Sequence, residues 1–409
     1  MKVLPQISMV TSGVLLAMSA MASEPSTLSD ALTSGPLHLD FRYRLETVNQ
    51  DGFAQSAVAS TLRTRINYGT LAYKGISAFV EADNVSYLGE DKFNNTRNGQ
   101  TAYPTVADPD GTDLNQLYVK YASTNGGATL GRQRINLDNQ RFIGGVGWRQ
   151  NEQTYDAAAI SFSRITNLDL LYGYVNRIAR VFGPDAGSPP ATLDSSSHIV
   201  HAHYNAGARG EFSGYGYFLD VVDVPSVSSR TLGIRYTNEF ARGSYQFPIT
   251  VEYARQNDFA DNPLSFSANY FHFETGVKTS ALQVAVGDEI LGADTSAGVA
   301  FSTPLATLHA FQGWADMFLS TPAKGIDDRY LSFKGGEGGT SFSITWHDFN
   351  SDVDCLQYGH EVDFSFAQKL DDHVSLLVKY ANYNADGFGT NTNKLWLVIT
   401  ASLAPGPSR

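Results

Sequence analysis

The sequence has little charge, one cysteine and no long apolar run beyond its first residues. Charged residues make up 17% of the 409 residues, whereas a typical soluble domain carries about 25%. The single cysteine, Cys355, cannot form an intrachain disulfide, and no Cys/His spacing is typical of structural zinc. With 29 basic against 41 acidic residues, the chain lacks the basic surplus with which nucleic-acid-binding proteins neutralise phosphates. These absences argue against nucleic acid as a partner.

The first residues resemble a secretory leader. Lys2 is followed by an apolar stretch over residues 10–21 and by small residues before Ser23, which is the pattern of a cleaved signal peptide. We expect a signal peptide over residues 1–22 and a short periplasmic segment over 23–36. After the leader there is no run of 18 apolar residues. A mean hydropathy of −0.20 is also too polar for a helical membrane protein.

Strict two-residue alternation dominates the rest of the chain. Side chains of a strand point to opposite faces with a period of two, so alternation predicts a strand with one apolar and one polar face. No long window fits the helical period instead. The clearest example has these apolar residues on one parity: Leu37, Leu39, Phe41, Tyr43 and Leu45.

The connections between the predicted strands alternate between short turns and long polar loops. This order is typical of an up-and-down transmembrane barrel with periplasmic turns and extracellular loops. We therefore predict an all-β fold, a single antiparallel barrel of about 18 strands over residues 37–403, with a tail over 404–409. A soluble sandwich would not sort its loops by length. Tyrosines near strand ends, such as Tyr121, Tyr380 and Tyr383, are expected in the interfacial girdles.

Three stretches resemble the alginate-export family of outer-membrane barrels. Residues 131–133, 141–144, 148 and 155–157 resemble the family's GRQ...RxxG...W...[FY]DA pattern, and residues 308–316 and 359–363 match further stretches, the latter leading to Lys379-Tyr380-Ala381. The resemblance implies an 18-stranded outer-membrane channel that is narrowed by inward-folded loops and lined by cations. It is weak evidence for the substrate, because family members need not all move alginate.

Arginines on the polar parity are the candidate pore lining. A barrel of this size leaves an aqueous lumen, and arginine stays charged and binds carboxylates through two parallel hydrogen bonds. Arg132 shares the parity of Leu130, so a lumen position requires its strand to end or bulge there. The alternative is that the arginines pair with Glu46, Glu81 and Asp83 across the wall. The candidates are Arg42, Arg44, Arg63, Arg65, Arg132, Arg134, Arg141 and Arg149.

Two long loops, 133–152 and 292–326, are the candidate constriction. Both carry more apolar and aromatic residues than freely solvated loops do, so we expect them to pack inside the barrel. Gly144, Gly145 and Gly147 are expected to permit a tight inward turn. An extracellular cap or an oligomer contact is the alternative.

The remaining patterns are weaker. Asp108, Asp110 and Asp113 have a calcium-loop spacing without the distal Glu, and His347-Asp348 lacks a serine motif, so no metal, cofactor or enzyme activity is predicted. We expect a passive outer-membrane channel for an anionic polysaccharide or oligosaccharide. The alternatives are a porin for small anionic solutes and a barrel-based adhesin. Expected partners are outer-membrane lipids, the anionic solute and, for export, periplasmic proteins.

Overall fold

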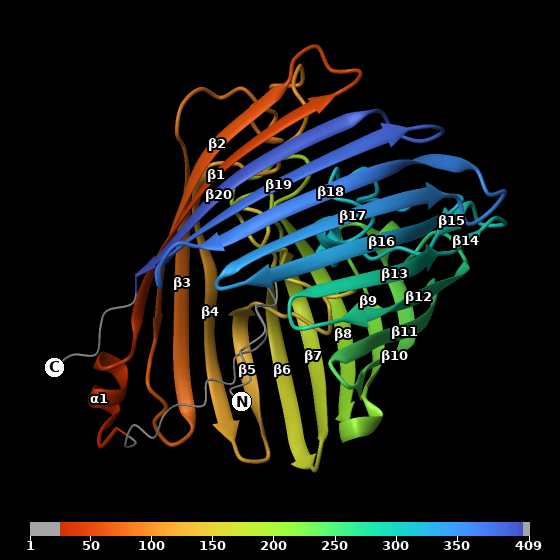
Figure 1. Cartoon of the computed structure of the whole chain (residues 1–409). Helices are drawn as coiled ribbons and strands as arrows, with labels where there is room; N and C mark the ends of the chain where they lie inside the picture. The colour runs from red at the N-terminus through yellow and green to blue at the C-terminus, as the bar shows by residue number, and fades with distance from the viewer. Residues whose placement is uncertain (1–24, 404–409) are drawn as a thin grey trace.

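Eighteen long antiparallel strands form one closed barrel (Figure 1). The computed structural model describes residues 25–403, so the predicted signal peptide and the predicted tail over 404–409 lie outside the described residues. The first barrel strand, β1, pairs with the last, β20, from Leu39↔Leu403 to Gln50↔Thr392. This closure leaves no free sheet edge. The predicted single barrel and its strand count are confirmed.

The strands are longer than most strands of soluble proteins, as a tilted bilayer crossing requires. A two-stranded hairpin, β14–β15, lies within a long loop and is not part of the barrel. The elements are α1 (Leu28–Thr33), β1 (Leu37–Gln50), β2 (Ala57–Gly69), β3 (Ile76–Tyr87), β4 (Gly111–Ser123), β5 (Gly126–Gln133), β6 (Thr154–Ile165), β7 (Leu168–Ala179), β8 (Thr192–Asn205), β9 (Glu211–Leu219), β10 (Ser229–Arg242), β11 (Tyr245–Asp258), β12 (Ser267–Lys278), β13 (Leu282–Leu291), β14 (Ala293–Asp294), β15 (Val299–Ala300), β16 (Ile326–Glu337), β17 (Thr340–Asn350), β18 (Gln357–Lys369), β19 (Val374–Ala385) and β20 (Thr392–Leu403).

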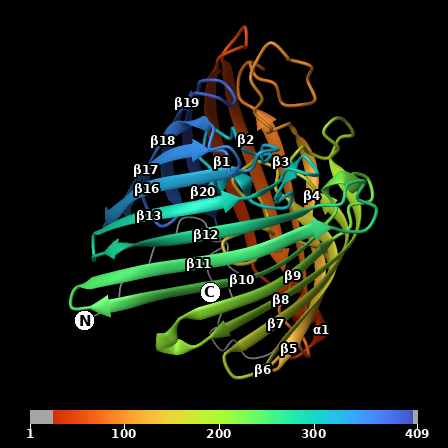
Figure 2. The same ribbon diagram turned by 90° about the vertical axis from the view of Figure 1, so that its right-hand side faces the viewer.

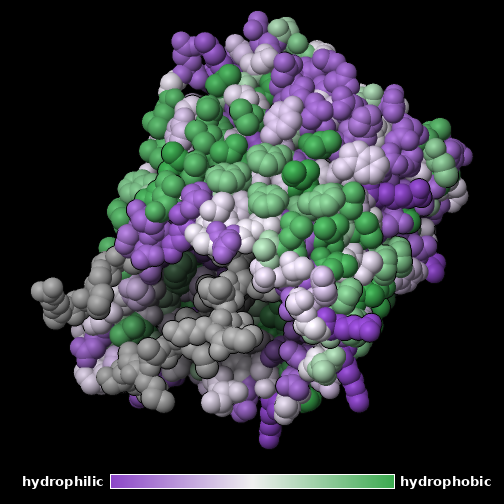
Figure 3. All heavy atoms as spheres, in the orientation of Figure 1, coloured by the Kyte–Doolittle hydropathy of each residue, from purple (hydrophilic) through white to green (hydrophobic). Residues whose placement is uncertain are grey.

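The outer surface of the barrel carries an apolar belt. Leu130 and Ile234, in the middle of β5 and β10, are 67% and 56% exposed and point outward. On the face that Figure 3 shows, apolar side chains gather in a band with polar residues on either side (Figure 3). Burying this band in lipid removes it from water, so the barrel wall is suited to a membrane. Among residues 25–403, no helix is long and apolar enough to cross a membrane.

Most strand bounds agree with the predicted alternation, and the differences occur where the backbone bends. β2 ends at Gly69, before the predicted end at residue 74, because the ladder with β3 stops there and the Leu71 backbone N–H donates to the Ala31 carbonyl instead. β8 begins at Thr192 rather than at residue 197, because its pairing with β7 resumes beyond an irregularity after Val175 and continues to Ala179↔Thr192. The predicted girdle position of Tyr383 is wrong, because that side chain is buried inside the barrel.

A hydrophobic core fills part of the barrel interior. The loops over 134–153 and 292–325 enter the lumen, and Figures 1 and 2 show the teal segment of the second loop inside the ring of strands (Figure 2). Phe142 of the first loop packs against Phe301 of the second and against Tyr215 and Tyr270 of the wall. The predicted inward folding of both loops is confirmed.

A short helix lies at the end of the barrel where the strands are joined by short turns. Thr27 caps α1 by accepting a hydrogen bond from the Asp30 backbone N–H. Tyr68, at the end of β2, donates to the Leu32 carbonyl, and the Leu71 backbone N–H donates to the Ala31 carbonyl. The segment predicted as periplasmic is therefore held against the first hairpin by hydrogen bonds.

Candidate functional site: a charged constriction inside the barrel

The loop between β5 and β6 enters the lumen and reaches the wall at β1 and β2, several strands away around the ring. Arg42 of β1 donates to Gln150 Oε1 at 2.9 Å, to the Gly147 carbonyl at 2.8 Å and to the Arg149 carbonyl. Gln150 Nε2 in turn donates to Thr61 Oγ1 of β2 at 2.8 Å. The tip of the loop is thus fixed to the first two strands by several hydrogen bonds.

The glycines of this loop do not act as predicted. None of Gly144, Gly145 and Gly147 has positive φ, and Val146 adopts φ 49° instead. Space is the reason for two of them: a Cβ on Gly144 would lie 2.5 Å from Thr307 Oγ1, and a Cβ on Gly145 would lie 2.8 Å from Arg134 Cγ. These glycines allow close packing rather than a left-handed turn.

The loop between β13 and β16 packs against both the first loop and the wall. The Gly144 backbone N–H donates to the Leu305 carbonyl at 2.9 Å, which joins the two loops. On the wall side, Glu361 and Asp363 of β18 accept the backbone N–H groups of Ala315 and Trp314 at 2.7 and 3.1 Å. Buried carboxylates therefore anchor the loop through its main chain.

One ion-pair cluster joins β1 to the first loop. Arg44 lies 2.6 Å from Glu46 and 3.4 Å from Asp108. Arg149 lies 3.3 Å from Glu46 and 3.4 Å from Asp316 of the second loop. Burial alone lowers the pKa of Arg149, but these carboxylates outweigh it and hold that pKa above its ordinary value.

A second cluster is centred on Glu152 of the first loop. Glu152 lies 2.8 Å from Arg65 and 3.5 Å from Arg63, and it also pairs with Arg134. Arg65 forks onto Asp83, with nitrogen to oxygen distances of 2.6 and 3.1 Å. Burial raises the pKa of Glu152, but the surrounding arginines outweigh it and hold that pKa well below its usual range.

The predicted alternative, in which the arginines pair with wall carboxylates, thus describes most of the array. Arg42 differs, because within residues 25–403 its hydrogen bonds go to neutral oxygens. The two clusters together hold six guanidiniums, one ammonium and six carboxylates, since Lys394 of β20 pairs with Asp316 at 2.7 Å, so one positive charge is in excess. The cations are Arg42, Arg44, Arg63, Arg65, Arg134, Arg149 and Lys394, and the anions are Glu46, Glu81, Asp83, Asp108, Glu152 and Asp316.

Two predicted pore residues lie elsewhere. Arg132 shares the outward parity of Leu130 and forks onto Asp156 at 2.8 and 3.1 Å on the outside of the wall, because β5 continues without a bulge through this position. We therefore leave Arg132 out of the pore lining. Arg141 lies inside, but its guanidinium is buried between Glu289, at 2.7 Å, and the ring of Phe311, so it holds the two loops together.

Sequence reasoning missed a buried lysine and its aromatic surroundings. Lys379 of β19 donates to His309 Nε2 at 2.7 Å, and its Nζ lies 3.6 Å from the ring centre of Trp314 and 4.1 Å from that of Trp148. His309 Nδ1 lies 2.7 Å from Asp316 Oδ1. The sequence held one signal for this cluster. The stretches that resemble the alginate-export family contain all three residues, Lys379, His309 and Trp314.

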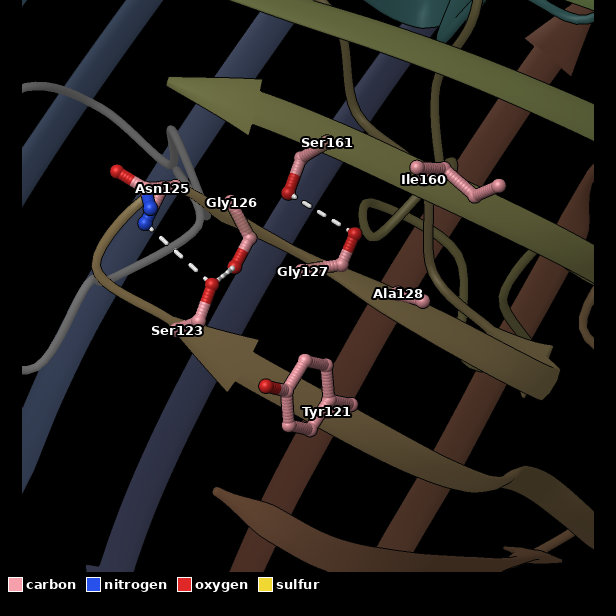
Figure 4. A pocket seen from close by; sticks show the side chains of 8 residues that line it. All are labelled: Tyr121, Ser123, Asn125, Gly126, Gly127, Ala128, Ile160 and Ser161. Carbon is pink, nitrogen blue, oxygen red and sulfur yellow. Dashed lines mark hydrogen bonds between the residues drawn. The ribbon is translucent and has the colours of Figure 1, made fainter. Parts of the chain in front are cut away.

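Two other features do not form a site in the lumen. Asp108 pairs with Arg44 while Asp113 lies on the outside near Arg132, so the aspartates with calcium-loop spacing do not converge. Among the described residues no group of three or more metal-ligating side chains is placed to hold an ion. A shallow hollow at the β4–β5 turn, shown in Figure 4, has its two serine hydroxyls, of Ser123 and Ser161, bonded to the Gly126 and Gly127 carbonyls (Figure 4).

Comparisons with known proteins agree with this architecture. A family model described as alginate export matches residues 36–175. No curated protein matches the chain. The crystal structure of Acinetobacter baumannii OccAB4 is similar with 11% identity and a TM-score of 0.72, covering 92% of this chain and 100% of that chain.

Two structures from Pseudomonas aeruginosa have the same fold. OccK9 (OpdG) has 14% identity and a TM-score of 0.73 over 92% of this chain and 100% of that chain. OpdK with vanillate has 11% identity and a TM-score of 0.72 over 91% of this chain and 100% of that chain. The resemblance to the alginate-export family is thus confirmed over residues 36–175, and the fold and the apolar belt are those of an outer-membrane β-barrel.

Proposed function

We propose that the channel passes carboxylated solutes passively along the arginine array of the constriction. The observation that carries the proposal is the shared inward face of Arg42, Arg63 and Arg65, with Arg42 directly opposite Arg63 across the β1–β2 pair. Like charges directly opposite one another are unfavourable, and Glu152 pairs with Arg63 but not with Arg42. A solute carboxylate beside Arg42 would therefore reduce the repulsion. The excess of one positive charge supports a weak anion preference rather than a strict filter.

The leading substrate is an anionic saccharide chain, such as a short uronate oligosaccharide. The family match supports this choice, and a lumen narrowed by two inward loops would suit an extended chain. Small organic carboxylates are the second candidate. They are supported by the similar OpdK structure with vanillate. An adhesin is less well supported, because the two loops with the largest apolar surface face inward and are not available to a partner outside.

Planar-bilayer measurements on the refolded full chain test the proposal. Under a potassium chloride gradient, the reversal potential should show a modest preference for chloride. Short uronate oligomers should block the current at lower concentrations than neutral oligomers of the same length do. Glucuronate permeation without block by oligomers would favour the second candidate. A cation preference together with no effect of either uronate would reject carboxylated solutes.

A further inference from the structure

Two extracellular loops contact each other beside an unpartnered arginine. The loops over 88–110 and 180–191 meet where a Cβ on Gly183 would lie 2.9 Å from Pro109 Cγ. A Cβ on Gly187 would lie 2.4 Å from Arg97 Nη1. The backbone at Gly187 therefore lies directly against the Arg97 guanidinium, in a position that a larger residue would block.

The guanidinium of Arg97 has no hydrogen-bond partner among the described residues. Its Nε, Nη1 and Nη2 atoms are all buried, and none of them donates to an oxygen of residues 25–403. Leaving a buried charged group unpaired is costly. This differs from the constriction, where Arg44, Arg63, Arg65, Arg134 and Arg149 all pair with carboxylates.

A second arginine lies close to the first. Arg180 donates only to the Pro190 carbonyl, at 3.3 Å, and its guanidinium lies over the ring of Phe182, 4.5 Å from the ring centre. Burial and the positive charge of Arg97 lower the pKa of Arg180. No acidic side chain of the described residues lies within ion-pair distance of either arginine. Two cations thus share this contact without an opposite charge.

We infer that Arg97 and Arg180 form a binding site for an oxyanion, a carboxylate or a phosphate, at the extracellular mouth. A bound oxyanion would accept hydrogen bonds from the free Arg97 nitrogens and neutralise both charges. Residues 181–190 make no hydrogen bonds from backbone to backbone with other described residues, and the Pro190 carbonyl accepts only from the Arg180 side chain, so few main-chain bonds oppose a shift of this segment that admits the ligand. The anion is either a carboxylated solute or the phosphate of an outer-leaflet glycolipid.

This inference does not depend on the anion preference of the pore, so the two can fail separately. Thermal unfolding of the full chain in detergent tests it, in sodium phosphate or sodium glucuronate against sodium chloride of equal ionic strength. A ligand that binds the folded state raises the apparent Tm. Wild type should gain several degrees in phosphate or glucuronate, and Arg97→Gln and Arg180→Gln should lose that gain. Arg97→Lys, which keeps the charge without the fork, should retain part of it.

Arg209→Gln is the matched control, because Arg209 is an exposed arginine in a periplasmic turn. Phosphate also stabilises folded proteins by exclusion from their surface, and this general effect raises the Tm of every variant. The difference in Tm gain between Arg97→Gln and Arg209→Gln therefore measures binding at the site. Vesicles with and without lipid A distinguish the two sources. If lipid phosphate fills the site, added phosphate will raise the Tm only in vesicles without lipid A, whereas a solute site will respond in both. An Arg97→Gln protein that responds like Arg209→Gln would overturn the inference.

Discussion

The imidazole ring of His309 stacks flat on the indole of Trp148, with the ring centres 4.5 Å apart and the planes 4° from parallel. The two residues belong to different inward loops, so the stack joins one loop to the other inside the barrel. Lys379 of the wall donates to the same imidazole, and Asp316 lies on its other side. One ring therefore connects both loops and the wall of the constriction.

Trp148→Ala is expected to loosen the constriction. The variant removes the stack on His309 and one of the rings over Lys379, and an aromatic pair contributes about 0.5–1.5 kcal/mol beyond its buried area. Single-channel conductance should rise, and the midpoint of unfolding should shift to a lower urea concentration. Trp346→Ala is the control, because Trp346 points outward. Unchanged conductance in Trp148→Ala would show that the stack does not narrow the pore.

Acid is expected to weaken the contact between His309 and Lys379 in the constriction. Burial lowers the pKa of His309 to about 3, although Asp316 opposes the shift. A group whose pKa is lower in the folded state stabilises that state fully above its unfolded pKa of about 6.5. This contribution falls as the pH drops from about 6.5 towards 3, because the imidazole of the unfolded chain takes up a proton that the buried ring does not accept until about pH 3. The free energy of unfolding should therefore fall over that range, and conductance should rise only near pH 3, where protonation of the folded ring removes the acceptor for Lys379.

His309→Gln should remove this part of the pH dependence, since glutamine does not titrate there. The comparison is made with the free energy of urea unfolding measured at pH 7, 6, 5 and 4, and with conductance recorded at pH 4 and 3, in both proteins. If the two profiles are parallel, the titrating group lies elsewhere.

Replacing Arg63 and Arg65 by Ser should lower anion preference and also destabilise the barrel. A side chain in a water-filled lumen could be replaced with little loss of stability, but both arginines are buried and pair with Glu152. Removing one partner of a buried pair costs about 3–5 kcal/mol.

The control for the variant that replaces Arg63 and Arg65 is Arg132→Ser, which removes an ion pair on the outside of the wall. That pair is partly exposed, so the free energy of unfolding should change by about 1 kcal/mol or less. Reversal potentials and urea unfolding should separate the variants. A reversal potential that is the same in all of them would exclude Arg63 and Arg65 from selectivity.

The strands could be predicted from sequence because a lipid-facing barrel repeats one local rule at every strand. Ile234 and Tyr253, on neighbouring strands, both point outward as their parity requires. The constriction was predictable only in part. Which loop carboxylate meets which wall arginine depends on how far the loop crosses the lumen, and periodicity contains no such information. Glu152 was therefore missed, although it contacts three of the predicted arginines.

Ile234→Arg is expected to destabilise the barrel in a bilayer. Ile234 is 56% exposed near the middle of β10, and arginine at the bilayer midplane costs about 2–4 kcal/mol. Leu370→Arg, at a periplasmic turn where the side chain is 57% exposed, should change the unfolding free energy by about 0.5 kcal/mol or less. Urea unfolding in vesicles measures both. Equal losses would mean that the apolar band does not contact lipid.

Deleting residues 140–147 should open the channel. The segment contains Phe142 and Ile143, which are buried in the interior core, and Arg141, which pairs with Glu289. Its removal also breaks the Gly144 hydrogen bond to Leu305, so the second loop loses its contact with the first. Single-channel conductance should rise clearly while the heat-modifiable mobility of a folded barrel is kept. Deleting the exposed residues 260–261 should leave conductance unchanged, because that loop lies outside the lumen. A folded 140–147 deletion with wild-type conductance would place the constriction elsewhere.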